Sequence, residues 1–290
     1  GFVNIIGNPN VGKSTLMNAL VGEKLSIITS KAQTTRHRIL GIVNGDDFQI
    51  VFSDTPGILK PCYKLQESMM NFVRGALSDA DVLLYVTDTV ERDDERAAEI
   101  IDRIRQSGVP TLVVVNKIDL TTQEALEALV EKWRATLPDA EIIPISAREG
   151  FNIAGLFDRI LALLPEGEPF YPKDTLTDKT LRFFASEIIR EKILRNYDKE
   201  IPYSCEIEIE EYREEPGIDR ISAVIYVARN SQKGILIGHK GEKLKKVGRQ
   251  AREELEEFLR KKVFLQLFVK VSEDWRNDQR QLRRFGYDPQ

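Results

Sequence analysis

Short apolar runs alternate with stretches of helical period over the first 166 residues. Runs rich in β-branched residues predict buried strands at Phe2–Ile6, Val82–Val86, Thr111–Val115 and Ile142–Ile145. The periodic stretches predict helices at Lys13–Val21, Arg92–Gln106, Thr122–Thr136 and Ile153–Leu163. This alternation is typical of crossover units, so we expect an α/β domain with a mostly parallel sheet and helices on both faces.

One hairpin interrupts the parallel pattern. Asn44 and Gly45 lie between two alternating apolar runs. The Asn-Gly pair is a strong turn signal because both residues tolerate a positive φ. We therefore expect one antiparallel strand at the edge of the sheet.

The pattern changes at residues 167–179, where prolines, acids and threonines replace the periodic positions. We interpret this segment as a linker between a domain at 1–166 and a second domain at 180–290, since 290 residues exceed what one core usually organises. The second domain is predicted to be α+β, in the order helix Leu181–Asn196, strands Tyr203–Glu211 and Arg220–Ala228, a short helix, a turn, helix Glu242–Arg260 and strand Val263–Val271.

Composition narrows the function classes only a little. With 42% hydrophobic and 30% charged residues and no apolar run near the roughly 20 residues that span a bilayer, an integral membrane protein is not expected. Cys62 and Cys205 are far apart, which argues against a disulfide framework or zinc site and favours the reducing cytoplasm. The net charge of −4 does not by itself favour a nucleic-acid partner, but a local basic surface can lie within an acidic chain.

The first candidate chemistry is a phosphate-binding loop. Gly7, Gly12, Lys13 and Ser14 match G-x-x-x-x-G-K-[ST] between a predicted strand and a predicted helix. In such a loop, backbone N–H groups and the positive end of the helix bind phosphates, the lysine reaches the β- and γ-phosphates, and the serine binds Mg²⁺. We predict nucleotide contacts from Gly7, Asn8, Asn10, Val11, Gly12, Lys13, Ser14 and Thr15.

Guanine selectivity is predicted by two later motifs, each of which follows a predicted strand. Asp119 of the sequence NKID can accept from N1–H and the 2-amino group of guanine, and adenine offers neither donor. The stem of Lys117 can cover the base, and the N–H of Ala147 suits O6. The predicted base-site residues are Asn116, Lys117, Asp119, Ser146, Ala147 and Arg148.

Switch elements are predicted between these motifs. In DTPG, Asp54 is expected to hold Mg²⁺ through water, and the N–H of Gly57 to sense the γ-phosphate. Either Thr34 or Thr35 can supply a further Mg²⁺ ligand, and we favour Thr35. The predicted metal ligands are Ser14, Thr35 and Asp54.

Many small GTPases carry a water-orienting glutamine directly after the glycine of D-x-x-G. Here that position is Ile58, which cannot orient water. We therefore expect slow intrinsic hydrolysis of GTP to GDP and phosphate.

The second domain carries the sequence GHKG between the short helix and the long one. A G-x-x-G loop lets a nucleic-acid backbone approach closely, and KH domains clamp about four nucleotides with it. Lysines crowd this turn, and a groove floor is expected from Leu236, Leu244 and their neighbours. Basic helices are also common as solvated faces. We predict RNA contacts from Ile235, Ile237, Gly238, His239, Lys240, Gly241, Lys243, Lys245 and Lys246.

The C-terminal tail allows two interpretations. Arg280, Arg283 and Arg284 lie on a predicted helix beside Trp275 and Phe285, and such side chains can stack on bases. Alternatively, Trp275 only packs this helix onto the domain, together with Leu282.

The order GNPNVGKS, TTRH, DTPG, NKID, SAR, followed by GHKG, closely resembles the Era family of GTPases over the whole chain. This resemblance implies a P-loop GTPase domain followed by a type II KH domain, with GTP or GDP and Mg²⁺ as ligands. It implies binding of the 3′ end of 16S ribosomal RNA and a role in assembly of the small ribosomal subunit, and no DNA partner. It also implies a cytoplasmic protein with weak peripheral association at the inner face of the plasma membrane.

The resemblance further implies that Asn10 helps bind K⁺ during hydrolysis, as in relatives with asparagine at this point of the loop. On the sequence alone, Asn10 can equally serve as a turn residue. We predict catalytic roles for Lys13, Asn10, Thr35 and Gly57.

Three alternatives remain. A ribosome-assembly GTPase of the Der type has two GTPase domains and lacks G-x-x-G, whereas this chain has one set of motifs and both glycines. A constitutive RNA-binding module with a structural nucleotide is compatible with Ile58. A GTPase of tRNA modification lacks support because no cysteine or folate-type element accompanies the motifs.

Overall fold

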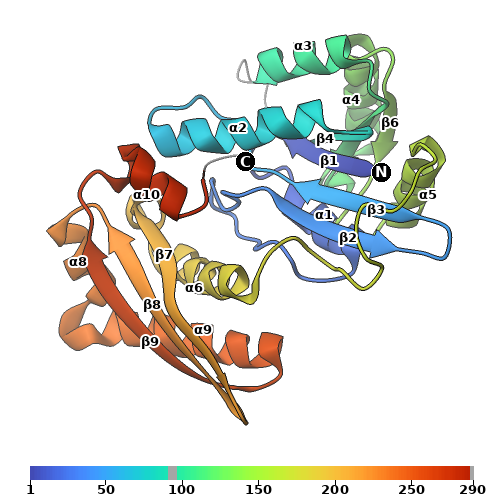
Figure 1. Cartoon of the computed structure of the whole chain (residues 1–290). Coiled ribbons are helices and arrows are strands. Elements are labelled where there is room, and N and C mark those ends of the chain that lie inside the picture. Colours follow the sequence, from blue (N-terminus) through green and yellow to red (C-terminus); the bar gives the residue numbers. More distant parts are fainter. Residues whose placement is uncertain (91–96, 288–290) are drawn as a thin grey trace. The chain divides into compact units, whose positions relative to one another are not determined.

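The computed structural model describes residues 1–90 and 97–287, which form two compact units (Figure 1). One unit contains Gly1–Cys62 and Gln66–Asp178. The other contains Tyr63–Leu65 and residues 179–287. Each unit has its own sheet and its own hydrophobic core.

A six-stranded sheet forms the centre of the first unit, in the order β2-β3-β1-β4-β5-β6. All neighbours pair in parallel except β2, which is antiparallel to β3 at the edge. The mostly parallel sheet with one antiparallel edge strand is therefore confirmed. The strands are β1 (Phe2–Gly7), β2 (Ile39–Asn44), β3 (Gln49–Asp54), β4 (Val82–Asp88), β5 (Thr111–Asn116) and β6 (Glu141–Pro144).

Helices cover both faces of this sheet. On one face, α2 (Lys64–Ser78), α3 (Ala98–Ser107) and α4 (Gln123–Thr136) bury apolar residues against β1, β4 and β5. On the other face, α1 (Lys13–Val21) contacts β1 and β3, and Phe157 of α5 (Ile153–Leu163) lies 6.4 Å from the ring of Phe52. Helices on both faces are what the alternating pattern predicts.

Two helices of this unit differ from the sequence prediction. The predicted helix Arg92–Gln106 begins outside the described residues, and α3 is observed from Ala98. The helix α2 was not predicted, although Leu65, Met69, Val73 and Leu77 recur at helical spacing and are buried. Gln66 and Ser68 are buried beside this stripe, and such polar residues interrupt the apolar pattern in the sequence.

The segment predicted as a linker lies along the edge strand β2. The N–H of Ile42 donates to the carbonyl of Leu176 at 2.8 Å, and Gly41 forms a bridge with Thr177. Phe170 contacts Phe2 edge-on, with 4.8 Å between the ring centroids. Much of residues 167–179 therefore belongs structurally to the first unit and covers an otherwise unpaired sheet edge.

The second unit has a three-stranded sheet in the order β7-β8-β9, with β7 antiparallel and β9 parallel to the central strand. Its elements are α6 (Leu181–Asn196), α7 (Ile201–Ser204), β7 (Cys205–Glu215), β8 (Ile218–Val227), α8 (Asn230–Ile237), α9 (Glu242–Leu259) and β9 (Lys262–Val271). The order helix-strand-strand-helix-helix-strand is the predicted one. The short helix α7, with Pro202 in its first turn, replaces the predicted start of the first strand.

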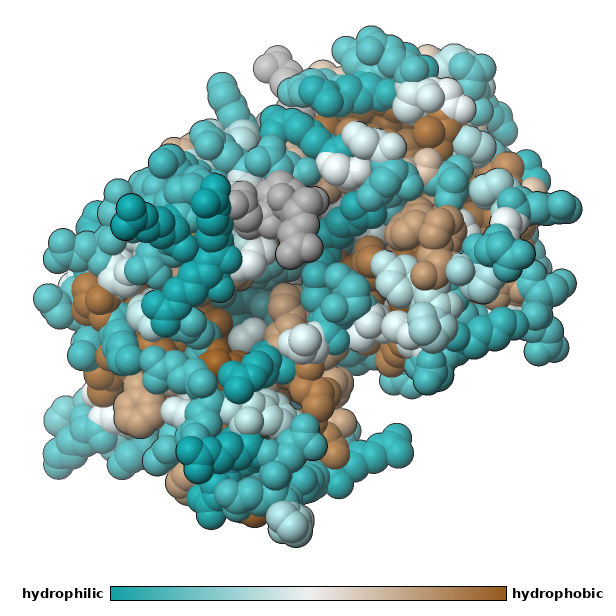
Figure 2. Space-filling view, viewed as in Figure 1, coloured by the Kyte–Doolittle hydropathy of each residue, from teal (hydrophilic) through white to brown (hydrophobic). Residues whose placement is uncertain are grey.

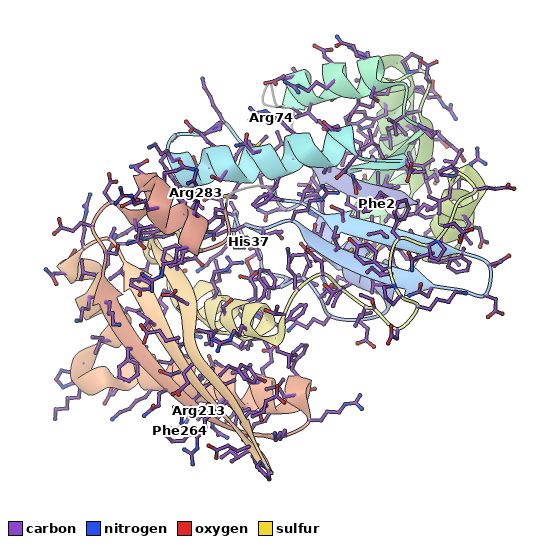
Figure 3. The ribbon with its side chains drawn as sticks, in the orientation of Figure 1. Phe2, His37, Arg74, Arg213, Phe264 and Arg283 are labelled. Atoms are coloured by element: carbon purple, nitrogen blue, oxygen red, sulfur yellow. The ribbon has the colours of Figure 1, made fainter. Side chains whose placement is uncertain are left out.

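The C-terminal tail packs onto the second unit. Trp275 is fully buried, its indole N–H donates to the carbonyl of Ser204 at 3.0 Å, and its ring meets Phe285 edge-on. Leu282 of α10 (Gln279–Arg284) is also buried, while Arg283 lies on the same short helix (Figure 3). The interpretation of Trp275 as a base-stacking residue is wrong, because its ring has no exposed face.

Hydrophilic side chains predominate on the surface, and hydrophobic ones form separate small patches on the face that Figure 2 shows. Among the helices of the described residues, none combines the length and the apolar character needed to cross a membrane.

Candidate nucleotide site and RNA-binding surface

The phosphate loop joins β1 to α1 in a conformation that needs glycine. Gly12 has a φ of 98°, and a Cβ there would lie 2.2 Å from the side-chain nitrogen of Asn116. The ammonium of Lys13 donates to the carbonyl of Asn8 at 2.8 Å, which keeps this side chain folded over the loop. One pocket is lined by this loop and by later segments, including Pro9, Asn10, Gly12, Lys13, Ser14, Thr15, Gln33, Thr34, Thr35, Gly57 and Lys117.

Three side chains with oxygen ligands, two hydroxyls and one carboxylate, lie close together beside this loop. The hydroxyl of Ser14 donates to Oδ2 of Asp54 at 2.7 Å and lies 2.9 Å from the hydroxyl of Thr35. The residues come from α1, the loop before β2, and the end of β3, so the parallel pairing of β1 with β3 brings them together. Hard oxygen donors in such a cluster suit Mg²⁺.

The two candidate threonines have different surroundings. The hydroxyl of Thr34 donates to the carbonyl of Lys31 at 2.6 Å and lies 2.6 Å from that of Thr29. It is therefore engaged within its own loop, whereas Thr35 faces Ser14. This geometry places Thr35, and not Thr34, with the other two predicted metal ligands.

Asp54 is fully buried, and its second carboxylate oxygen, Oδ1, accepts no hydrogen bond of normal geometry from the described residues, although the hydroxyl of Ser26 lies near the carboxylate. Burial raises the pKa of Asp54, although the hydrogen bond from Ser14 and the charge of Lys13 act in the opposite direction. A buried carboxylate oxygen without a partner is costly unless a cation or donor meets it. The site therefore fits a bound cation.

Asn116 connects the base-site loops to the phosphate loop. Its amide nitrogen donates to the carbonyl of Val11 at 2.9 Å, and its oxygen accepts the N–H of Ala147 at 2.9 Å. The N–H that the sequence assigns to guanine O6 is thus engaged with Asn116 in this structure. For the N–H of Ala147 to contact guanine O6, its hydrogen bond to Asn116 must become bifurcated or break.

Lys117 directly precedes a short 3-10 turn after β5, Ile118–Leu120, and Asp119 lies within that turn. The ammonium of Lys117 donates to the carbonyl of Asn10 at 2.5 Å and forms an ion pair with Asp88. Asp119 is exposed, and its Oδ1 accepts the hydroxyl of Ser146 at 2.6 Å. The side chain of Asp119 is therefore oriented by Ser146, and its second oxygen is available to a base.

Arg148 does not converge with these groups. Its side chain is 85% exposed, and within the described part of the chain its ion-pair partner is the neighbouring Glu149, at 3.7 Å. Sequence reasoning also missed two side chains near the site, Asp88 and Asn18. Asn18 accepts the N–H groups of Leu25 and Ser26 at 3.0 Å each and so fixes the chain that leads into the switch segment. Its position one helical turn after Ser14 was the available signal.

Ile58 is locked into the core of the first unit. It is 1% exposed and packs in the same cluster as Ile6 and Met70, while its N–H donates to the carbonyl of Gly7 at 3.1 Å. The side chain thus points away from the pocket that Gly57 lines. Neither its chemistry nor its direction allows it to orient water.

We therefore expect that replacing Ile58 by glutamine does not increase the rate of GTP turnover. The new amide would be buried among apolar side chains, and we expect a loss of about 2–4 kcal/mol in the free energy of unfolding. Turnover measurements and urea titrations of Ile58→Gln beside Ile58→Val test this. Faster turnover in a protein of unchanged stability would contradict the buried orientation.

The G-x-x-G loop joins α8 to α9. Gly238 has a φ of 74° and Gly241 a φ of 78°, and Lys240 between them is also left-handed, with a φ of 49°. His239 and Lys240 are exposed at the tip. The two glycines leave the backbone open at both ends of the loop, as close approach to a nucleic-acid backbone requires, while His239 and Lys240 extend from its tip.

Exposed cations surround this loop. The basic residues around the loop, which are named at the end of this paragraph, form no ion pair with another described residue. Ile235 is 44% exposed, but Leu236 is fully buried in the core and Ile237 packs partly against it. Leu236 is thus not part of a groove floor, because its side chain points to the sheet. The exposed cations are Lys240, Lys243, Lys245, Lys246 and Arg249.

Comparisons with known proteins agree with both units. The model of the 50S ribosome-binding GTPase family matches residues 2–117, and that of the KH domain family matches residues 200–276. The curated protein GTPase Era of Syntrophus aciditrophicus is 46% identical, with 99% of this chain and 95% of that protein covered. GTPase Era of Alkaliphilus metalliredigens is 45% identical, with 99% of this chain and 98% of that protein covered.

Solved structures are equally similar. A tyrosine-to-alanine variant of Aquifex aeolicus Era bound to GDP·AlF4⁻ has a TM-score of 0.95 and 43% identity, covering 100% of this chain and 99% of that one. Era in complex with MgGDPNP and nucleotides 1506–1542 of 16S ribosomal RNA gives the same values. These matches confirm the Era resemblance and rule against the Der type. The chain belongs to the family of GTPase Era and is a guanine-nucleotide-binding GTPase with a C-terminal KH domain.

Proposed function

We propose that this GTPase binds the 3′ end of 16S ribosomal RNA through its KH domain in a nucleotide-dependent way and acts in assembly of the small ribosomal subunit. The observation that carries this proposal is the full-length similarity to an Era complex with nucleotides 1506–1542 of 16S ribosomal RNA. The left-handed G-x-x-G loop with its unpaired lysines supports it.

In the nucleotide site, Ser14, Thr35 and Asp54 would hold Mg²⁺ bound to the phosphates of GTP. Mg²⁺ would neutralise phosphate charge. Lys13 would leave the carbonyl of Asn8 for the β- and γ-phosphates, and Gly57 would meet the γ-phosphate. The buried Oδ1 of Asp54, which accepts no hydrogen bond of normal geometry from the described residues, supports this assignment.

Asn10 is the residue that we propose for K⁺. Its side chain is exposed at the pocket and forms no hydrogen bond with the described residues, while its φ of 65° is one that asparagine tolerates. A turn role and a cation role are thus compatible. Equal turnover in K⁺ and Na⁺ would remove the cation role.

On the RNA side, Ile235, His239, Lys240, Lys243, Lys245 and Lys246 would contact the strand together with the two loop glycines. The lysines would neutralise phosphates, so we expect affinity to fall steeply as salt rises. Ile237 is partly buried and would contribute less than Ile235. The cytoplasmic location and the peripheral membrane association stay predictions.

Nucleotide control of RNA binding is the decisive test. A short single-stranded RNA that ends in the 3′ sequence of 16S ribosomal RNA is titrated with the protein in the presence of GDPNP, of GDP and of neither. We expect tighter binding with GDPNP, because switch segments change order with the γ-phosphate. A scrambled RNA of equal length is the control for charge alone.

Two outcomes would change the proposal. Equal affinity in all three nucleotide states would favour the alternative of a constitutive RNA-binding module joined to an independent GTPase. Equal affinity for the scrambled RNA would remove the sequence-specific role at the end of 16S ribosomal RNA.

A further inference from the structure

Asp88 is a buried carboxylate beside the nucleotide site that none of the sequence motifs includes. It is the last residue of β4, and the parallel register aligns it with Asn116, the first residue of NKID, on β5. It is 5% exposed. A buried carboxylate needs a partner, and the position of Asp88 shows which one.

The contacts of Asp88 account for both carboxylate oxygens. Oδ1 accepts the N–H of Val90 at 3.0 Å, which fixes the carboxylate in its own turn. Oδ2 forms an ion pair with the ammonium of Lys117. The same ammonium donates to the carbonyl of Asn10 at 2.5 Å, so the ion pair extends to the phosphate loop.

Lys117 is held at its other end as well. The hydroxyl of Thr89 donates to the carbonyl of Lys117 at 3.0 Å. The φ of Lys117 is 63°, a left-handed conformation that a residue with a side chain seldom adopts. Asp88 and Thr89 at the end of β4 thus fix the tip and the backbone of a lysine whose conformation is locally unfavourable.

We propose that Asp88 is a positioning residue for guanine nucleotide binding, acting through Lys117. It holds the lysine stem extended along the site of the base and keeps its ammonium on the carbonyl of Asn10. Without the carboxylate of Asp88, the half-buried ammonium of Lys117 keeps only the neutral carbonyl of Asn10 as a partner among the described residues. The side chain of Lys117 then regains its rotamer freedom. The link through the Lys117 ammonium is then weakened, while the hydrogen bond from Asn116 to the carbonyl of Val11 in the phosphate loop remains.

The variant Asp88→Asn tests this with little change of shape, since an amide oxygen can still accept the N–H of Val90. We expect GDP and GTP to dissociate about tenfold faster, because a charge-assisted contact is lost. KM for GTP should rise by a similar factor. Single-turnover hydrolysis at saturating GTP should stay unchanged, since Asp88 contacts none of Lys13, Ser14 and Asp54.

A double-mutant cycle separates positioning from simple structural support. In a Lys117→Met background, Asp88→Asn should produce no further acceleration of GDP release. Thr89→Val, which keeps the carboxylate, should act in the same direction as Asp88→Asn but more weakly. Asp139→Asn, an exposed aspartate after α4, is the matched control and should leave release unchanged.

Three results would overturn the proposal. Unchanged GDP release in Asp88→Asn removes the role of the carboxylate. Equal acceleration with and without Lys117 shows that Asp88 supports the fold and does not act through the lysine. Slower single-turnover hydrolysis at saturating GTP places Asp88 in the chemical step instead.

Discussion

Replacing Asp119 by asparagine is expected to move the base preference of this GTPase from guanine to xanthine. The carboxylate can accept from both N1–H and the 2-amino group of guanine. Asparagine offers one acceptor and one donor, which suit N1–H and the 2-oxo group of xanthine. A site that loses a matched hydrogen bond rejects the former ligand strongly, so we expect GTP affinity to fall by about a thousandfold.

The structure indicates that this change is tolerated by the fold. Asp119 is exposed, and the hydroxyl of Ser146 that orients its Oδ1 can donate equally to an asparagine oxygen. Competition between GTP and XTP for the purified protein measures the effect. Asp119→Ala is the matched control, because it should lose GTP without gaining XTP. Undiminished GTP binding in Asp119→Asn would show that Asp119 does not read the base.

The second large effect is expected in the G-x-x-G loop. The double variant Gly238→Asp and Gly241→Asp should weaken RNA binding about a hundredfold or more, while GTP turnover without RNA stays unchanged. Both positions have a positive φ, and a Cβ on Gly238 would lie 2.7 Å from Cγ of Lys243. Two carboxylates would also repel the phosphates that this loop is proposed to approach.

A glycine elsewhere in the same unit provides the control for strain and charge. Gly217, in the turn between β7 and β8, has a φ of 80° and no atom within 4 Å of an added Cβ. Gly217→Asp therefore adds a similar backbone cost and a negative charge away from the loop. RNA titrations should show near-normal binding for this variant. Equal losses in both variants would mean that destabilisation of the unit, and not the loop, causes the effect.

The sequence by itself determined the two folds and the positions of the motifs. Glycines at positions of positive φ and runs of apolar residues are local properties of the chain. The glycines predict the phosphate loop and the turn before α9, and the apolar runs predict most strands of both sheets. The same periodicity was present in α2 and was missed. Motifs placed directly after strands could be expected at one edge, since parallel strands end together.

Only the tertiary structure decided which side chains meet. Thr34 and Thr35 are equivalent in sequence, and the loop path alone turns Thr35 toward Ser14. The burial of Trp275 depends on how the tail packs onto the second unit.

The ion pair of Asp88 with Lys117 depends on β4 and β5 being neighbours in register, and the course of residues 170–178 depends on a free edge at β2. Such pairings join residues far apart in the chain. They follow from strand order and packing, which the local pattern of apolar and polar positions does not specify.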